Sequence, residues 1–205
     1  MNEELKSRYP KRLLLVKYRG MGDAIIGQSS ISYLKSVFPE SHIVYAVPGW
    51  VAIMFKHLDC QASEVWPLSL ASTIDWLRLA FKILRSDFDV IVELHQSGRT
   101  KILLSIVAWL KRIPYFAHNH NTSGSTFILG HGVTKPSIQR DLDGVWPVVN
   151  TYQKDLTPPS YLNFPPRLGL LSPVPPKNEL AFGLAVDMPR EGFELQSKAT
   201  LSSVF

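Results

Sequence analysis

The chain has 205 residues, of which 45% are hydrophobic and 19% charged. This ordinary globular composition excludes a disordered, collagen-like or coiled-coil chain as a whole. Its 22 Lys and Arg against 17 Asp and Glu give a net charge of +5, which favours anionic partners. The single cysteine, Cys60, excludes an intrachain disulfide framework and a cysteine-rich zinc module.

The chain contains neither a secretory signal pattern nor a membrane-spanning pattern. Its first twelve residues mix acids, bases and a proline, and they lack the apolar core of a signal peptide. The longest apolar stretch, Ile102 to Leu110, is far shorter than the about 20 residues that a membrane span needs. We therefore expect a cytoplasmic protein.

Strand and helix patterns alternate along the first 150 residues. An unbroken apolar run at 12–18 predicts a buried strand, followed by a turn at 19–23 and a helix over 24–38 that Pro39 ends. The remaining predicted elements are strands at 43–47, 64–68, 88–94 and 114–117, helices at 50–57, 74–84, 101–110 and 137–150, the last interrupted at Trp146-Pro147, and a long loop at 118–136. Such alternation predicts an α/β fold with a Rossmann-like parallel sheet and helices on both faces.

The proline distribution divides the chain. Seven of the 15 prolines lie between Pro158 and Pro176, a density that predicts an extended linker rather than a regular element. We therefore expect one domain at 1–156, a proline-rich linker at 157–178, and a remainder at 179–205. That remainder contains one strand-like run, 180–186, and is expected to be a fragment of a further domain or a disordered tail.

The turn after the first strand is the strongest candidate site, because ligands of open α/β sheets bind at the carboxyl ends of strands. Gly20-x-Gly22 resembles the start of a dinucleotide fingerprint, but position 25 is Ile25 instead of the third glycine. The second strand also ends without the carboxylate that would hold a ribose, and Asp23 would repel a pyrophosphate. A nicotinamide or flavin site is therefore disfavoured.

Asp23 has two readings. Aspartate is among the best N-cap residues, and caps are far commoner than active sites, so capping of the following helix is the simpler one. The other is catalysis: a carboxylate at this edge, next to Lys17 and Arg19, could accept a proton from a sugar hydroxyl as a general base. The flanking Gly20 and Gly22 would let a bulky acceptor approach the backbone.

Basic side chains accompany two of the predicted helices. They are Arg78, Lys82, Arg85, Lys111 and Arg112. The simpler reading is a solvated helix edge, since Lys and Arg stems often cover apolar surface. The functional reading is contact with an anionic inner membrane leaflet. Because the bases are dispersed and no aromatic RNA-binding motif accompanies them, nucleic acid is not an expected partner.

The other chemistry-bearing residues give weaker signals. His118, His120 and His131 have no acidic residue or cysteine among them, so we expect no metal site there. Cys60 has no identifiable base and is expected to be structural. Trp50, directly after the turn of the second strand, is the tryptophan to test for stacking on a sugar.

The opening segment resembles the amino-terminal domain of the ADP-heptose:lipopolysaccharide heptosyltransferases, which are glycosyltransferase family 9. The resemblance rests on the strand and turn Leu13-Leu-Leu-Val-Lys-Tyr-Arg-Gly-Met-Gly-Asp23, followed by a helix ending Phe38-Pro39. The stretch 88–95 with Arg99-Thr100 looks like a second family segment, and Gln139-Arg140-Asp141 falls where the family carries an arginine-bearing helix. Together these cover residues 11–150.

The resemblance implies the amino-terminal half of a two-domain GT-B enzyme that is inverting and metal-independent and uses no cofactor. The donor would be ADP-heptose or another nucleotide sugar, and the acceptor a lipopolysaccharide core or other anionic glycan at the inner face of the membrane. Carried over by motif, Asp23 matches the catalytic base, and Lys17 and Arg99 match basic positions. The full acceptor-binding set is expected to be Lys17, Arg19, Gly20, Gly22, Arg99 and Thr100.

Three departures from the family pattern bear on this reading. Glu93 stands where the family has aspartate, which a structural carboxylate would tolerate, and Gln96-Ser97-Gly98 differs at a segment that bears on acceptor identity. Only a linker and a fragment stand where the donor half would follow, so the chain is expected to be truncated and inactive alone. The alternative is a non-catalytic module that binds an acceptor or partner.

Overall fold

A computed structural model of the chain describes residues 9–56, 58–94, 98–118 and 135–170. These residues belong to one compact unit that extends to Leu171. Its strands are β1 (Arg12–Val16), β2 (His42–Pro48), β3 (Leu58–Asp59), β4 (Glu64–Leu68), β5 (Val90–Leu94), β6 (Tyr115–His118) and β7 (Gly169–Leu170). Its helices are α1 (Met21–Ile26), α2 (Gln28–Val37), α3 (Gly49–Ala52), the 3-10 turn η2 (Met54–Lys56), α4 (Thr73–Arg85), α5 (Gly98–Lys111) and α6 (Ser137–Tyr152).

Five parallel strands form the central sheet in the order β4-β2-β1-β5-β6. The central strand β1 pairs with β2 from Arg12↔His42 to Val16↔Ala46 and with β5 from Leu13↔Val90 to Val16↔Glu93. Its run of apolar residues is buried on both faces, as strands of parallel sheets require. The predicted α/β class with a parallel sheet and helices on both faces is confirmed.

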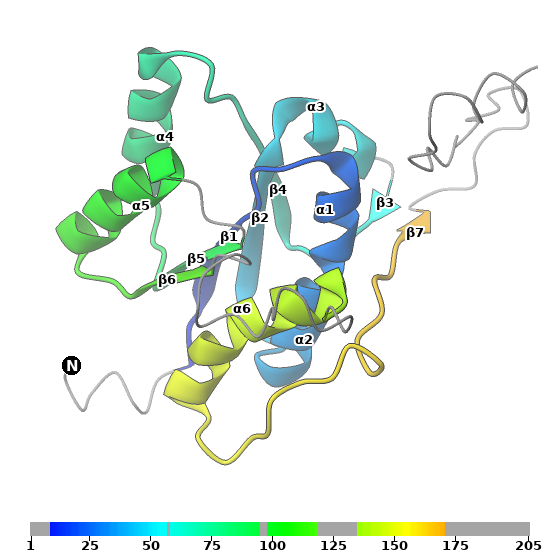
Figure 1. The fold of residues 1–205 in the computed structure, drawn as a ribbon. Coiled ribbons are helices and arrows are strands. Elements are labelled where there is room, and N and C mark those ends of the chain that lie inside the picture. Colours follow the sequence, from blue (N-terminus) through cyan, green and yellow to red (C-terminus); the bar gives the residue numbers. More distant parts are fainter. Residues whose placement is uncertain (1–8, 57, 95–97, 119–134, 171–205) are drawn as a thin grey trace, which may run out of the picture. The chain divides into compact units, whose positions relative to one another are not determined.

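Alternate residues of the strands face two separate cores. Leu13 and Leu15 of β1 pack with residues of α1, α2 and α6, whereas Leu14 and Val16 pack with residues of α4 and α5. This alternation follows from the two-residue period of a strand. The sheet therefore lies between one layer formed by α1, α2, α3 and α6 and another formed by α4 and α5 (Figure 1).

Three of the predicted helices differ from the observed ones. The helix predicted at 50–57 is observed as the short α3 followed by the 3-10 turn η2. The helix predicted over 24–38 starts earlier, at Met21, and is divided into α1 and α2 at Gly27. The interruption predicted at Trp146-Pro147 is wrong, because α6 continues through Pro147. The buried face formed by Val145, Val148 and Val149 holds the helix in place despite the hydrogen bond that proline cannot donate.

The helix α6 packs closely on the carboxyl ends of β5 and β6. A Cβ atom at Gly144 would lie 2.8 Å from Leu94 Cδ2 and 2.9 Å from His118 Cβ. Only glycine therefore allows α6 to approach the two strands at this distance. This close contact brings Asp141, one turn earlier on α6, over the end of the sheet.

The first part of the predicted linker lies along the domain. Gln139 Nε2 donates to the carbonyl of Pro159 at 2.9 Å, and Gln139 Oε1 accepts from the Tyr161 amide at 2.9 Å. The Phe164 ring packs edge-on against Tyr33 with 5.0 Å between centroids, and β7 pairs antiparallel with β3. Residues 157–168 contain no helix or strand, and these contacts hold them against the domain.

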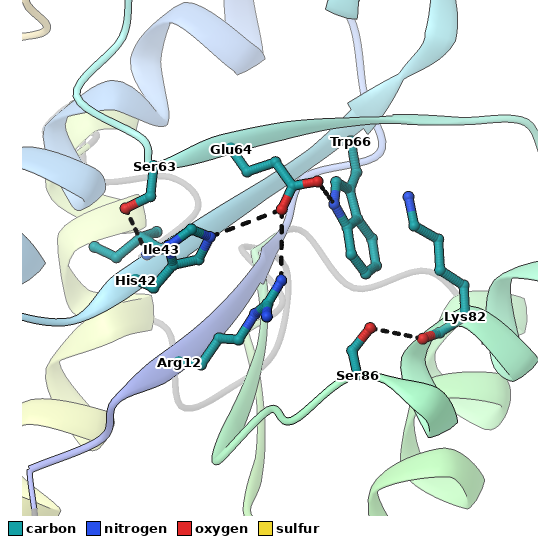
Figure 2. Close-up of polar contacts among 8 residues, drawn as sticks. All are labelled: Arg12, His42, Ile43, Ser63, Glu64, Trp66, Lys82 and Ser86. Carbon is teal, nitrogen blue, oxygen red and sulfur yellow. Dashed lines mark hydrogen bonds and ion pairs between the residues drawn. The ribbon is translucent and has the colours of Figure 1, made fainter.

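Polar contacts join the amino-terminal ends of three strands, opposite the edge where ligands of such sheets bind (Figure 2). Glu64, which begins β4, contacts Arg12 of β1 at 3.5 Å and His42 of β2 at 3.7 Å, and accepts from the Trp66 indole. Lys82 of α4 lies over the Trp66 ring, its Nζ 3.6 Å from the centroid. These contacts tie α4 to β4 and leave the opposite edge as the candidate site.

Candidate active site

The carboxyl ends of the five parallel strands meet at one edge, and most of the predicted site residues lie there. The segment 17–23 follows β1, Trp50 lies in α3 directly after β2, and Arg99 and Thr100 begin α5 after β5. The amide of Lys17 donates to the Ala46 carbonyl at 2.9 Å, so the chain leaving β1 still adjoins β2. The fold thus brings together segments that are distant in sequence.

Asp23 is the third residue of α1, in the first turn, and is not the N-cap. The N-cap is Gly20, and no side chain caps this helix, so the capping reading of Asp23 is wrong. Its side chain is half-buried, and within the described ranges its carboxylate has no hydrogen bond or ion pair. The carboxylate is therefore partly open to solvent at the strand edge.

Lys17 lies inside the protein rather than at its surface. Its side chain is fully buried, and Nζ forms an ion pair with Asp141 Oδ2 of α6, which is also fully buried. Removing either charge would leave the other unpaired in a low-dielectric interior. Lys17 thus joins the end of β1 to α6, beneath the turn that carries Asp23.

Tyr45 of β2 supports the same turn from below. Its hydroxyl donates to the carbonyl of Ala24 at 2.9 Å, one residue after Asp23. Complete burial raises the pKa of Tyr45 well above its usual 10.0, and the nearby Asp141, Cys60 and Asp23 act in the same direction. Tyr45 is therefore a neutral donor that holds α1 in place.

Gly27 makes this arrangement sterically feasible. A Cβ atom there would lie 2.3 Å from Tyr45 Oη, 3.2 Å from Tyr45 Cζ and 3.3 Å from Lys17 Cδ. The break between α1 and α2 is thus the place where the chain passes directly over Tyr45 and Lys17. Glycine at this position fixes the height of α1 above the sheet, and with it the position of Asp23.

The rest of the turn is open. Tyr18, Arg19, Gly20, Met21 and Gly22 are all exposed, and a Cβ at Gly22 would meet no atom within 4 Å. Trp50, on the adjoining α3, has 60% of its surface exposed. The space around Gly22 is therefore open, and the exposed aromatic residues Tyr18 and Trp50 follow β1 and β2 at this edge.

Thr100 and Arg99 lie differently at the start of α5. Thr100 is buried and donates its hydroxyl to Glu93 Oε1, while Tyr115 donates to Glu93 Oε2. Glu93 is thus a buried carboxylate at the end of β5 with both oxygens bonded. Arg99 is exposed, and it is the side chain of this pair that can reach a ligand.

Sequence reasoning gave no role to three residues whose side chains support this edge: Tyr45, Asp141 and Tyr115. Tyr45 occurs within an apolar strand run and gave no sign that its hydroxyl crosses to α1. Asp141 is 124 residues from Lys17, so no local pattern could pair them. The one signal in the sequence was that Lys17 directly follows an apolar strand, because a buried ammonium group requires a charged or hydrogen-bonding partner.

The alternative sites receive little support in the parts of the chain that the structure covers. Groups of three or more His, Cys, Asp or Glu able to hold a metal are absent among the described residues, and His120 and His131 lie outside them. Cys60 is buried, and burial raises the pKa of its thiol, as suits a structural cysteine. No described helix is both long and apolar enough to cross a bilayer.

No protein-family description matches the sequence, and no curated protein does. Among solved structures, a family 9 glycosyl transferase from Veillonella parvula aligns with 69% of this chain and 41% of its own length, with 17% identity and a TM-score of 0.51. The E. coli ADP-heptose lps heptosyltransferase II aligns with 72% of this chain and 44% of its own, with 16% identity and a TM-score of 0.50.

The chain thus spans less than half the length of either solved structure. Identities of this size establish a likeness of fold, and the resemblance to the heptosyltransferases is confirmed at that level. This chain has the α/β fold found in part of two glycosyltransferase structures, one of them a heptosyltransferase.

Proposed function

We propose that this chain is the acceptor-binding half of a glycosyltransferase of the heptosyltransferase type. The reaction moves a sugar from a nucleotide-sugar donor, ADP-heptose or a relative, to a lipopolysaccharide core or another anionic glycan. The observation that supports this most is Asp23, a carboxylate without a partner among the described residues at the carboxyl edge of the sheet. The fold shared with two glycosyltransferase structures supports the reaction class.

Asp23 acts as general base in the proposed reaction. Its carboxylate takes the proton of an acceptor hydroxyl while that oxygen attacks the anomeric carbon of the donor sugar. The bond from this carbon to the diphosphate oxygen breaks, and the nucleoside diphosphate leaves with the electron pair. Because attack comes from the face opposite the leaving group, the anomeric configuration inverts. The mechanism needs no metal, and the donor is assigned to a second domain.

The neighbouring residues divide into ligand contacts and supports. Arg19 and Arg99 are exposed at the edge and are proposed to hold phosphate or carboxylate groups of the acceptor, through charge-assisted hydrogen bonds. Gly20 and Gly22, both exposed, are proposed to let the glycan approach the backbone. Lys17 and Thr100, which were predicted as direct contacts, are proposed to act from beneath, through Asp141 and Glu93 respectively.

Acceptor binding by the 205-residue chain tests this assignment. We expect a delipidated, phosphorylated lipopolysaccharide core to bind in calorimetry, and the same core without phosphates to bind at least about tenfold more weakly. Arg19→Gln with Arg99→Gln should abolish the difference, while Lys154→Gln, an exposed change in the turn after α6, should preserve it. Equal affinity for both cores would contradict the proposed contacts.

The alternative is a non-catalytic module that binds the acceptor. It would be favoured if the chain bound the acceptor but showed no sugar transfer when joined to a donor-binding domain. The distinction therefore requires a transfer assay, for which Asp23 is the informative position. Peripheral contact with the cytoplasmic face of the membrane, where such an acceptor is made, is part of the proposal.

A further inference from the structure

The helix α4 carries large apolar side chains on its solvent side. Ile74, Leu77, Phe81 and Leu84 recur at helical spacing, and each is exposed, Leu77 by 64%. The opposite face of α4, with Leu79 and Ile83, is buried against the sheet. An amphipathic helix in water normally has charged residues on its outer face, so α4 is apolar on two faces.

The neighbouring helix α5 has the same property. Ile102, Ile106, Trp109 and Leu110 are exposed, Trp109 by 76%, while Leu104, Val107 and Ala108 pack on the sheet. The helices adjoin in the same layer (Figure 1), and Lys111 Nζ at the end of α5 donates to the carbonyls of Leu84 at 3.2 Å and Ser86 at 2.7 Å. We call the eight exposed side chains of these two helices the α4–α5 face.

Positive charge surrounds the α4–α5 face. Arg78, Arg85, Lys101 and Arg112 are exposed on or directly after the two helices. The helix α5 has no acidic residue, and the one acid of α4, Asp75, accepts from the Ser72 amide in the cap and lies 3.8 Å from Arg78. Lys82 is not counted, because its ammonium group lies over Trp66 (Figure 2) and burial lowers its pKa.

We propose that the α4–α5 face docks on an anionic lipid bilayer. Apolar side chains with a tryptophan among them, accompanied by arginine and lysine, are the composition of segments that lie in the headgroup region. The apolar groups enter the acyl boundary and the basic groups contact lipid phosphates. A second copy of this chain fits less well, because a symmetric dimer would bring two positively charged faces together, and their like charges would repel.

This inference rests on the membrane contact of the proposed function and gives it a surface, but that surface lies on α4 and α5 and does not use Asp23, so docking and sugar transfer can be tested separately. Asp23→Asn is expected to bind vesicles like the unaltered chain. Failure of vesicle binding would therefore leave the proposed reaction standing, and failure of transfer would leave the docking surface standing.

Flotation of the 205-residue chain with vesicles tests the proposal. We expect it to bind vesicles of phosphatidylcholine with phosphatidylglycerol and to bind phosphatidylcholine alone far more weakly. Phe81→Ser with Trp109→Ser should lower the partition coefficient at least about tenfold, from the lost apolar burial. Arg78→Gln with Arg85→Gln should lower it by about tenfold on anionic vesicles only. Leu162→Ser and Ile53→Ser, equally exposed elsewhere, should change nothing.

Other outcomes would overturn the proposal. Equal binding to neutral and anionic vesicles would remove the role of the basic residues, and binding unaffected by the Phe81 and Trp109 changes would remove the surface itself. A dimer in light scattering that Trp109→Ser converts to monomer, without vesicle binding, would assign the face to a second copy. Because all these side chains are exposed, the substitutions leave the core intact, and unfolding curves verify this.

Discussion

Gly27 controls the height of α1 above the sheet, and its substitution should be costly. A methyl group at this position would overlap the hydroxyl of Tyr45, which is fully buried and cannot move aside. We expect Gly27→Ala to lower the free energy of unfolding by about 1–3 kcal/mol. Tyr45→Phe should relieve part of this, so that the double variant loses less than the sum of the single losses in urea unfolding. Strictly additive losses would contradict the contact.

The ion pair between Lys17 and Asp141 gives a second prediction for single residues. Asp141→Asn leaves a buried, uncompensated ammonium group and should cost about 3–5 kcal/mol in urea unfolding. The matched control is Asp143→Asn, two residues along α6, because Asp143 pairs with Lys135 at 2.8 Å in a partly exposed position. That change should cost about 1 kcal/mol or less. Similar losses of unfolding free energy for Asp141→Asn and Asp143→Asn would show that the buried Lys17–Asp141 pair matters no more to stability than the partly exposed one.

At the scale of elements, the start of α4 depends on a capping box. Ser72 Oγ accepts from the Asp75 amide at 3.2 Å, and the Asp75 side chain accepts from the Ser72 amide at 3.1 Å. These hydrogen bonds lower the pKa of Asp75. Ser72→Ala should cost about 1 kcal/mol and speed hydrogen exchange at the first turn of α4. The control is Ser105→Ala, because the Ser105 hydroxyl donates to the Ile102 carbonyl within α5. If hydrogen exchange at the first turn of α4 were equally fast in the Ser72→Ala and Ser105→Ala variants, the cap would be contradicted.

The strands and most helices could be predicted from the sequence because their patterns are local. The three central strands, β1, β2 and β5, are mostly apolar and buried, and the alternation of strands with helices predicts a parallel sheet. The start of α1 could not be predicted, because the Gly20-x-Gly22 turn lacks the apolar spacing by which helices are identified. The continuation of α6 through Pro147 depends on burial against the sheet, which the sequence does not display.

The candidate site could be predicted only in part, for the same reason. Asp23, Arg19 and Arg99 were found because motif and chain order place them after β1 and β5. The inward orientation of Lys17 and Thr100 depends on Asp141 and Glu93, and such long-range pairings leave no local pattern. Trp50, selected for its place after β2, does lie exposed at this edge.

At the scale of the whole molecule, buried tyrosines make stability fall in alkali. Burial raises the pKa of Tyr33 to about 12 and also raises the pKa values of Tyr45 and Tyr152 above the usual 10.0. The unfolded chain therefore loses these protons first, so the stability present below pH 10 declines as the pH rises toward 12. Urea unfolding between about pH 8 and pH 11 measures this. Tyr33→Phe should flatten the decline, and an unchanged slope in that variant would contradict it.

The account depends most on the chemistry of Asp23. The direct measurement compares sugar transfer by versions of a chimera that joins this chain to the part of the E. coli heptosyltransferase II that the alignment does not cover. One version is unaltered and the other carries Asp23→Asn, with Asp155→Asn, an exposed change after α6, as the control. Melting temperatures are recorded for all three.

We predict that Asp23→Asn lowers kcat by about 10²–10⁴-fold, the range of a general base, while the melting temperature and acceptor affinity stay the same. Asp155→Asn should retain full turnover. If Asp23→Asn transferred sugar as fast as the unaltered chimera, the carboxylate at the strand edge would have no part in catalysis and the proposed reaction at this edge would be refuted.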